Sequence, residues 1–279
     1  MNSRVKVCAF NSGQNGDLII NVAGAKIFKD KYPDHLLYLN VAEKYKDIIP
    51  LLQNNKYFDG IQVWENYDSW PSKRDAEIIE SGKYDLIGHP MKTHKDHWHK
   101  LRHQSCEVAY QNDIISLQEC EQYKDGVQIE LNQWFEIPDL KEYIAFFPFA
   151  GAYNWGNSKM LSIQKAQEIA DLIIEMGYKV LQIGGKDEPK IEGCEKFDTN
   201  IFDSVRNVLG CKALIHTDSF IGWAISGYQF PQIGLYNHLY YGEDCVKNIQ
   251  PVNPNSQYIS VENLDGLEYN KIQEMIKNL

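Results

Sequence analysis

Residues 143–177 read YIAFFPFAGAYNWGNSKMLSIQKAQEIADLIIEMG and are the clearest indication of the fold class. The first five residues are apolar or aromatic, which is typical of a buried strand. Residues 162–176 then carry apolar side chains at helical spacing, and Gly177 follows where a left-handed cap is favoured. A strand, a glycine-bearing loop and an amphipathic helix in this order predict one unit of a parallel α/β sheet.

The same alternation continues on both sides of this stretch, so we predict an α/β fold for the whole chain. Later in the chain we expect strands at residues 179–183, 213–216 and 232–235, and helices at residues 201–209, 220–227 and 265–278. Earlier in the chain we expect strands at residues 5–10, 36–41, 60–64 and 84–88, and an extended segment at residues 127–131. Helices of that half are expected to begin near Asp17, Ala42 and Lys73.

Length and composition favour two domains. A chain of 279 residues, of which 43% are hydrophobic, can bury two cores, which argues against intrinsic disorder. Residues 132–141 carry Pro138 among polar and acidic residues and are typical of a connection. We therefore predict a first domain over residues 1–136 and a second over residues 142–279.

Charge narrows the classes of partner. A net charge of −10 disfavours a protein whose whole surface binds anionic polymers, so nucleic acid is not expected as a partner. The same net charge is compatible with a small basic pocket. The N-terminal residues lack the features of a secretion signal, and no apolar stretch reaches membrane-spanning length, which predicts a cytoplasmic protein without a membrane span. The six cysteines include no CxxC pair, so we expect reduced structural thiols.

A first polar loop, residues 11–17, lies between an expected strand and an expected helix. Ligands of open α/β sheets bind at this edge. Gly16 permits close backbone approach, and the helix dipole favours an ionised Asp17, which could then accept a proton. The alternative is that Asp17 only caps the helix, the usual role of such a residue. Gly13 and Gly16 do not complete a dinucleotide-binding fingerprint.

Two further loops occupy equivalent places in the second half. Residues 148–159 precede the well-marked helix, so their backbone N–H groups and Lys159 could converge on phosphate. A solvated lysine is the plainer interpretation of Lys159. Thr217, Asp218 and Ser219 follow an apolar strand, and all three are ordinary helix-capping residues.

Residues 89–103 hold five of the eight histidines and are the most basic part of the chain. One helix would place Asp96, His99 and His103 on one face, as a metal site requires, but no fourth ligand can be identified and we expect no metal. The plainer interpretation is a solvated helix or one that faces an anionic acceptor. His89 and His94 are our candidate acceptor-binding residues in this segment.

Tryptophan rings suit the C–H faces of sugars, and Trp155 and Trp223 are the best placed by their positions near loops. Core packing is at least as good an explanation for the other four tryptophans.

Taken together, these loops resemble the glycosyltransferase family that includes the lipopolysaccharide heptosyltransferases. Gly16-Asp17 followed by a helix and Pro33 is similar to the family's N-terminal pattern. FPFAG at residues 147–151 resembles its His-Pro-Gly loop, and Lys159 sits at its lysine. Gly184-Gly185-x-x-Glu188 resembles its Gly-Gly-x-x-Glu turn, and residues 214–219 resemble its Asp-Thr/Ser-Gly-Pro-x-His loop. The match spans almost the whole chain in order.

The resemblance implies a GT-B fold, with two Rossmann-like domains whose parallel sheets face a cleft. It also implies an inverting, metal-independent transfer of a sugar from a nucleoside diphosphate sugar to a hydroxyl acceptor, without a cofactor. Asp17 would be the general base, with Asn15 and Gly16 beside the acceptor. The donor would be bound by Lys159, Gly151, Gly184, Gly185, Glu188, Thr217, Asp218, Ser219 and Trp223.

The sequence departs from the family pattern in the third loop, where Phe220 and Trp223 replace a glycine and a histidine. Two alternatives therefore stay open. One is a sugar-nucleotide epimerase or hydrolase, and the other is a sugar-nucleotide-binding protein without transfer activity.

Overall fold

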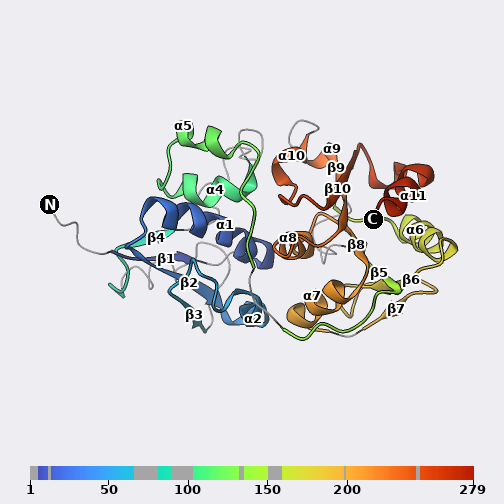
Figure 1. Cartoon of the computed structure of the whole chain (residues 1–279), viewed down its shortest axis with the longest axis horizontal. Helices are drawn as coiled ribbons and strands as arrows, with labels where there is room; N and C mark the ends of the chain where they lie inside the picture. Colours follow the sequence, from blue (N-terminus) through green and yellow to red (C-terminus); the bar gives the residue numbers. More distant parts are fainter. Residues whose placement is uncertain are drawn as a thin grey trace. The chain divides into compact units, whose positions relative to one another are not determined.

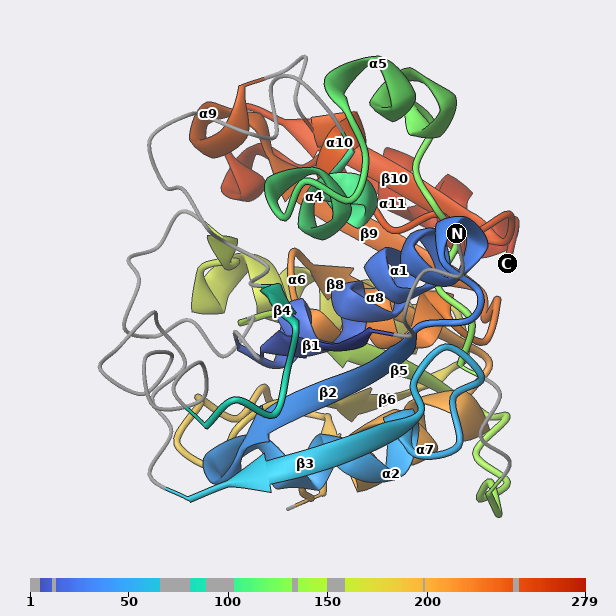
Figure 2. The same cartoon turned by 90° about the vertical axis from the view of Figure 1, so that its left-hand side faces the viewer.

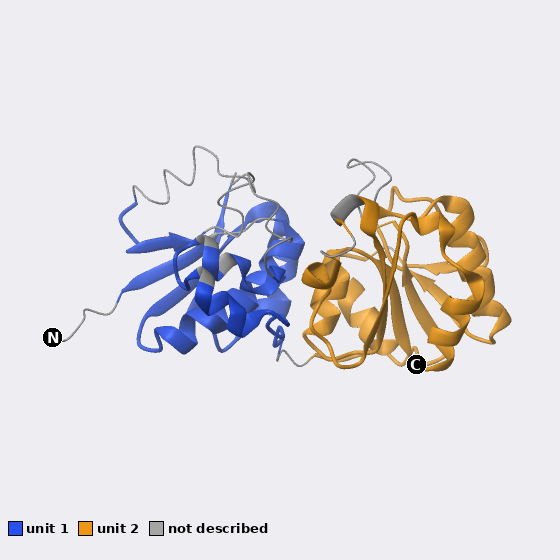
Figure 3. Cartoon of the chain, turned by 90° about the horizontal axis from the view of Figure 1, so that it is seen from above, with its two compact units in different colours: residues 1–133 blue, residues 134–279 orange. Residues whose placement is uncertain are grey.

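The structure is a computed structural model that describes residues 6–11, 14–65, 81–88, 103–131, 135–149, 159–197, 199–242 and 246–279. It divides into two compact units, Met1–Gln133 (unit 1) and Trp134–Leu279 (unit 2), which are coloured separately in Figure 3. Each unit is built on a parallel sheet with helices, so the α/β class predicted from the sequence is confirmed.

Unit 1 contains a parallel sheet with the strand order β3-β2-β1-β4 (Figures 1 and 2). Its strands are β1 (Val7–Asn11), β2 (Leu36–Ala42), β3 (Gly60–Trp64) and β4 (Leu86–Gly88). The helical segments are α1 (Asn15–Lys31), η1 (Glu43–Ile48), α2 (Ile49–Leu52), α4 (Gln104–Gln111), α5 (Leu117–Cys120) and η3 (Glu121–Tyr123). Helix α1 begins soon after β1 ends, so the first turn of α1 lies at the carboxyl edge of the sheet. The same helix packs against α4.

Two expectations for unit 1 concern its less regular parts. Residues 127–131, expected as an extended segment, belong to no helix or strand, and Val127, Ile129 and Leu131 are buried at alternate positions. The helix expected to begin near Lys73 lies outside the described residues.

Unit 2 contains a parallel sheet with the order β10-β9-β8-β5-β6-β7 (Figure 1). Its strands are β5 (Tyr143–Phe147), β6 (Lys179–Gln182), β7 (Glu195–Lys196), β8 (Ala213–Thr217), β9 (Gln232–Asn237) and β10 (Ser256–Val261). The helical segments are α6 (Ile163–Glu175), α7 (Ile201–Gly210), α8 (Phe220–Ser226), α9 (His238–Tyr241), α10 (Val246–Ile249), η6 (Leu264–Gly266) and α11 (Tyr269–Lys277).

The main core of unit 2 lies between the sheet and helices α6 and α11. Alternate strand residues such as Ile144 and Phe146 point into this core, where they meet Ile173 of α6 and Ile276 of α11. Helices α7 and α8 contact the sheet through β8. Gly177 ends α6 with a φ of +88°, the left-handed cap that the sequence predicts.

No helix in the described ranges is both long and apolar enough to cross a membrane.

Candidate functional site

Three of the predicted donor loops meet at one edge of the second sheet. They follow β5, β6 and β8, and β5 pairs with both of the other strands. All three strands are parallel, so their carboxyl ends lie at the same edge. This edge is the usual place for ligands in an open α/β sheet.

Lys159 and Asp218 form an ion pair at this edge. The Lys159 Nζ atom donates to Asp218 Oδ2 over 2.9 Å. A backbone hydrogen bond holds the segment of Lys159 near the end of β5, since the Leu161 N–H donates to the carbonyl oxygen of Pro148. The Lys159 side chain is 30% exposed and the Asp218 side chain 14%, so the lysine is partly exposed while the acid is largely covered.

The Asp218 loop is supported from the protein interior by His216. This imidazole is fully buried, and its Nδ1 atom lies 2.8 Å from the carbonyl oxygen of Thr217. A carbonyl oxygen only accepts, so Nδ1 donates and carries the proton. Burial lowers the pKa of His216 below its ordinary value, so the ring stays neutral and holds the peptide that leads into Asp218.

Gly222 allows helix α8 to pack against that ring. A Cβ atom at this position would lie 2.2 Å from His216 Cε1 and would meet both ring nitrogens at 2.8 Å. Glycine is therefore required here by close approach and not by an unusual backbone angle.

Gly184 and Glu188 form a compact turn after β6. Gly184 has a φ of +157°, and a Cβ atom there would lie 1.9 Å from Glu188 Oε2. The Glu188 side chain thus folds back over the glycine and is 8% exposed. Gly185, beside it, is exposed.

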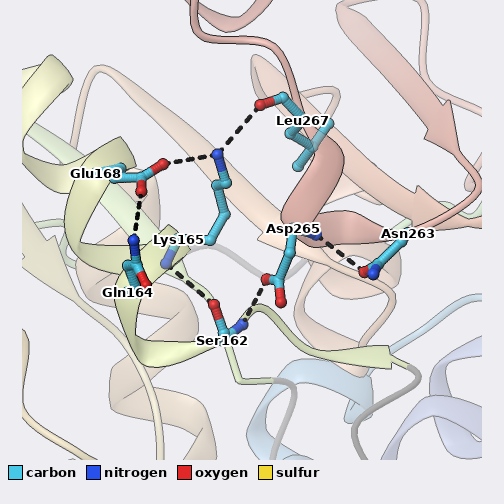
Figure 4. A network of polar contacts seen from close by, with 7 residues as sticks. All are labelled: Ser162, Gln164, Lys165, Glu168, Asn263, Asp265 and Leu267. Carbon is cyan, nitrogen blue, oxygen red and sulfur yellow. Dashed lines mark hydrogen bonds and ion pairs between the residues drawn. The ribbon is translucent and has the colours of Figure 1, made fainter.

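A polar network fixes the start of α6, the helix that follows Lys159 (Figure 4). Asp265 Oδ1 accepts a hydrogen bond from the backbone N–H of Ser162 over 3.0 Å, and the Ser162 hydroxyl accepts from the N–H of Lys165. The Lys165 ammonium contacts Glu168 at 2.6 Å and the carbonyl oxygen of Leu267 at 3.3 Å. These contacts tie the N-terminal turn of α6 to η6 and restrict where the chain can leave the Lys159 loop.

In unit 1, Asp17 occupies the first turn of α1, as the sequence predicts. Its Oδ2 atom accepts the N–H of Gln14 over 2.7 Å, so the carboxylate does cap the helix. The position near the positive end of α1 also favours the ionised form. Asn15 and Gly16 lie in the same turn, and Asn15 Oδ1 is buried with no hydrogen-bond partner among the described residues.

The structure corrects two expectations about side chains. Trp223 is 3% exposed and lies in α8, so its ring is buried and is not presented at the surface for stacking on a sugar. Thr217 is fully buried, with its Oγ1 3.5 Å from the carbonyl oxygens of Phe147 and Pro148. Its side chain therefore lies between strand ends and does not reach out to a donor. Ser219, by contrast, is the N-cap residue of α8, and its buried Oγ has no partner among the described residues.

Two members of the three-residue set considered for a metal, Asp96 and His99, lie outside the described residues. The third, His103, has an extended backbone and caps α4 by accepting the N–H of Ser105. No group of three metal-ligating side chains occurs where the chain is described. His89, His94, Trp155 and Gly151 lie outside the described residues.

Two residues that support these loops were not anticipated from the sequence. His216 looks like an ordinary strand residue in the sequence, and Lys196 ends the two-residue edge strand β7, which has no clear sequence pattern. Lys196 donates to the carbonyl oxygens of Gly185 and Glu188. Only the tertiary structure reveals both roles.

Comparison with known proteins gives a clear result at the level of structure. No family model and no curated protein matches the sequence. The structure is similar to the glycosyltransferase family 9 protein of Veillonella parvula, with a TM-score of 0.69 and 14% identity, covering 100% of this chain and 98% of that chain. It is similar to E. coli ADP-heptose lps heptosyltransferase II, with a TM-score of 0.67 and 15% identity over 98% of each chain.

A third similar structure is the E. coli heptosyltransferase WaaC with ADP, with a TM-score of 0.65 and 14% identity, covering 98% of this chain and 99% of that chain. Identities this low show a shared fold. Over nearly its whole length, the chain has the GT-B fold of the family 9 glycosyltransferases and heptosyltransferases, as its sequence motifs indicated.

Proposed function

We propose that the protein is an inverting glycosyltransferase that moves a sugar from a nucleoside diphosphate sugar to an acceptor hydroxyl without a metal ion. The observation that carries the proposal is the Lys159–Asp218 pair at the carboxyl edge of the second sheet. A partly exposed lysine side chain beside the ends of β5, β6 and β8 suits a diphosphate. The shared fold with heptosyltransferases supports the same conclusion.

The chemistry assigns one role to each unit. The acceptor hydroxyl attacks the anomeric carbon of the donor and gives its proton to the Asp17 carboxylate. The bond between that carbon and the diphosphate oxygen breaks, and the nucleoside diphosphate leaves with the electron pair. Lys159 stabilises the charge that develops on the leaving group. The mechanism requires Asp17 and Lys159 to act on the same pair of substrates.

Capping and catalysis by Asp17 are compatible roles. A carboxylate has about four lone-pair sites on two oxygens, so accepting the backbone N–H of Gln14 does not by itself prevent it from accepting a proton from a hydroxyl. The Asp17→Asn change preserves an oxygen for the cap but removes the basic group, so it separates the two roles.

The test combines donor binding with turnover. Nucleoside diphosphates and their sugars are screened by thermal shift, beginning with ADP because a similar structure contains it. A ligand that binds the folded state raises the apparent stability. Asp17→Asn is expected to lower turnover by about 10²- to 10⁴-fold and to leave donor affinity unchanged. Lys159→Met is expected to weaken donor binding by about tenfold or more.

Two matched variants serve as controls. Glu119→Gln alters a carboxylate that caps α5 in the same way, since Glu119 Oε2 accepts the N–H of Ser116 over 2.7 Å. Lys179→Met removes an ion-paired lysine from the opposite edge of the sheet, where it contacts Glu142 at 2.8 Å. Both should keep wild-type turnover and donor affinity.

Three outcomes would contradict the proposal: no nucleotide binds, Asp17→Asn retains full turnover, or donor alone is rapidly hydrolysed or epimerised. The third would favour a hydrolase or epimerase. Tight donor binding with no turnover on any acceptor extract would favour a binding protein.

A further inference from the structure

The turn after β6 is held by a lysine from the neighbouring edge strand. Lys196 Nζ donates to the carbonyl oxygen of Gly185 over 2.7 Å and to that of Glu188 over 2.9 Å. Strand pairing places this lysine beside the turn, because Gln182 at the end of β6 pairs with Lys196. One ammonium thus bridges both ends of the turn, and hydrogen bonds from a charged donor are stronger than those from a neutral one.

A buried glutamine holds the chain that leaves the turn. Gln182 is fully buried, its Nε2 donates to the carbonyl oxygen of Pro189 over 2.7 Å, and its Oε1 accepts the N–H of Ile191 over 2.9 Å. The segment is therefore fixed on its interior side by Gln182, and on its other side Lys196 donates to the carbonyl oxygens of Gly185 and Glu188.

The position of the Glu188 carboxylate depends on this geometry. Because Glu188 Oε2 occupies the space beside Gly184 that a Cβ atom would fill, a small movement of either residue changes where the carboxylate lies. A carboxylate accepts hydrogen bonds from hydroxyl groups, and a sugar nucleotide carries several of them. The alignment of Glu188 would therefore affect donor binding if this carboxylate contacts the donor.

We propose that Lys196 is a positioning residue for donor binding that acts through the Glu188 carboxylate. The inference rests on the proposed function, since it assigns Lys196 a part in the same donor site. Without the ammonium, the carbonyl oxygens of Gly185 and Glu188 lose their shared donor and the turn can relax. The lysine does not touch the reacting atoms, so the chemical step itself is unaffected.

The first test separates affinity from turnover. Lys196→Met should raise the donor KM and the Kd for ADP, or for the diphosphate that the screen selects, by about tenfold, with kcat at saturating donor unchanged. Lys196→Arg retains a charged donor and should recover part of the affinity. Lys190→Met removes an exposed lysine of the same segment and should match wild type.

The second test asks whether Lys196 acts through Glu188. In a double-mutant cycle, Lys196→Met should cost little further affinity once Glu188→Gln is present. Additive losses, or a Lys196→Met protein that binds like wild type, would overturn the inference while wild-type donor binding still supported the proposed function. If wild-type protein binds no nucleotide, the proposed function itself fails, and the inference fails with it.

Discussion

At the scale of single residues, the contact between His216 and Gly222 shows how little space the interior of unit 2 leaves. The imidazole is fully buried and hydrogen-bonded to the backbone that precedes Asp218. Neither the ring nor the helix can move without disturbing the other. The close spacing between β8 and α8 therefore depends on the lack of a Cβ atom at Gly222.

Gly222→Ala should therefore destabilise the protein by about 1–3 kcal/mol, even though alanine is the better helix former by about 1 kcal/mol. The reason is that the new Cβ would lie 2.2 Å from His216 Cε1. The free energy of unfolding from urea titration checks this. Gly266→Ala is the matched control, because a Cβ there meets nothing within 4 Å, and a loss as large at Gly266 would contradict the explanation.

The sequence anticipates residues at loops better than residues in the interior. Lys159 and Asp218 were both expected beside a diphosphate, and the structure brings them together because parallel strands end at one edge. Trp223 was misjudged because its position near a loop says nothing about which face of α8 it occupies. His216 and Lys196 act on backbone carbonyl oxygens that are distant from any motif, so no local pattern could indicate them.

At the level of elements, Glu130 forms ion pairs that connect the last described segment of unit 1 to α1 and to the loop before β3. Its carboxylate contacts Lys26 of α1 at 2.7 Å and Lys56, before β3, at 2.6 Å. Its backbone carbonyl oxygen accepts a hydrogen bond from the Asn55 side chain. The hydrogen bond from Lys26, followed by that from Lys56, lowers the pKa of Glu130 to about 2.

This pKa shift makes the contribution of Glu130 to stability depend on pH. The pKa is lower in the folded state than its ordinary value of 4.5, so the stabilisation is complete above that value and is lost as the pH falls towards 2. Glu130→Gln should cost about 1 kcal/mol or less near pH 7, since the group is partly exposed.

The measurement is urea unfolding of both proteins at several pH values between about 7 and 2.5. The difference between wild type and Glu130→Gln should shrink as the pH falls. A difference that stays constant would show that the ion pairs do not cause it. Glu121→Gln, at an exposed carboxylate, should have no comparable effect.

Element prediction succeeds where burial is regular and fails where pairing depends on distant segments. The strand expected at residues 143–147 is β5 to the residue, and α6 begins and ends within one residue of expectation. No strand was expected at residues 256–261, where the partly exposed residues of β10 pair with β9. Residues 127–131, expected to be extended, show alternating burial and lie in no strand.

At the scale of the whole molecule, each unit has its own sheet, while the predicted donor residues that the structure describes all belong to unit 2. Donor binding should therefore be a property of unit 2, and Asp17 of unit 1 should contribute to turnover only. The fold of each unit could be predicted from the sequence more fully than the substrates could. Alternating strands and helices specify each unit, but they do not specify which sugar, nucleotide or acceptor is used.

Hydrogen exchange with and without the nucleotide found by screening tests this division. Saturating nucleotide should slow exchange most at the carboxyl ends of β5, β6 and β8 and in the first turn of α6, because these segments surround Lys159 and Glu188. Local opening there becomes rarer by the factor 1 + [L]/Kd when only the closed form binds. Lys159→Met should abolish most of the protection. Equal protection in β1 to β4 would contradict a donor site confined to unit 2.

The bond between Ser162 and Asp265 joins residues 103 positions apart in the chain. During synthesis on the ribosome, the first turn of α6 therefore lacks this bond until residue 265 has emerged. Strands β5, β6 and β8 are made well before that moment, but the lysine loop beside them is not yet anchored through α6. A nascent chain stalled before residue 265 should consequently bind nucleotide poorly, even with all of the proposed phosphate-binding residues already translated.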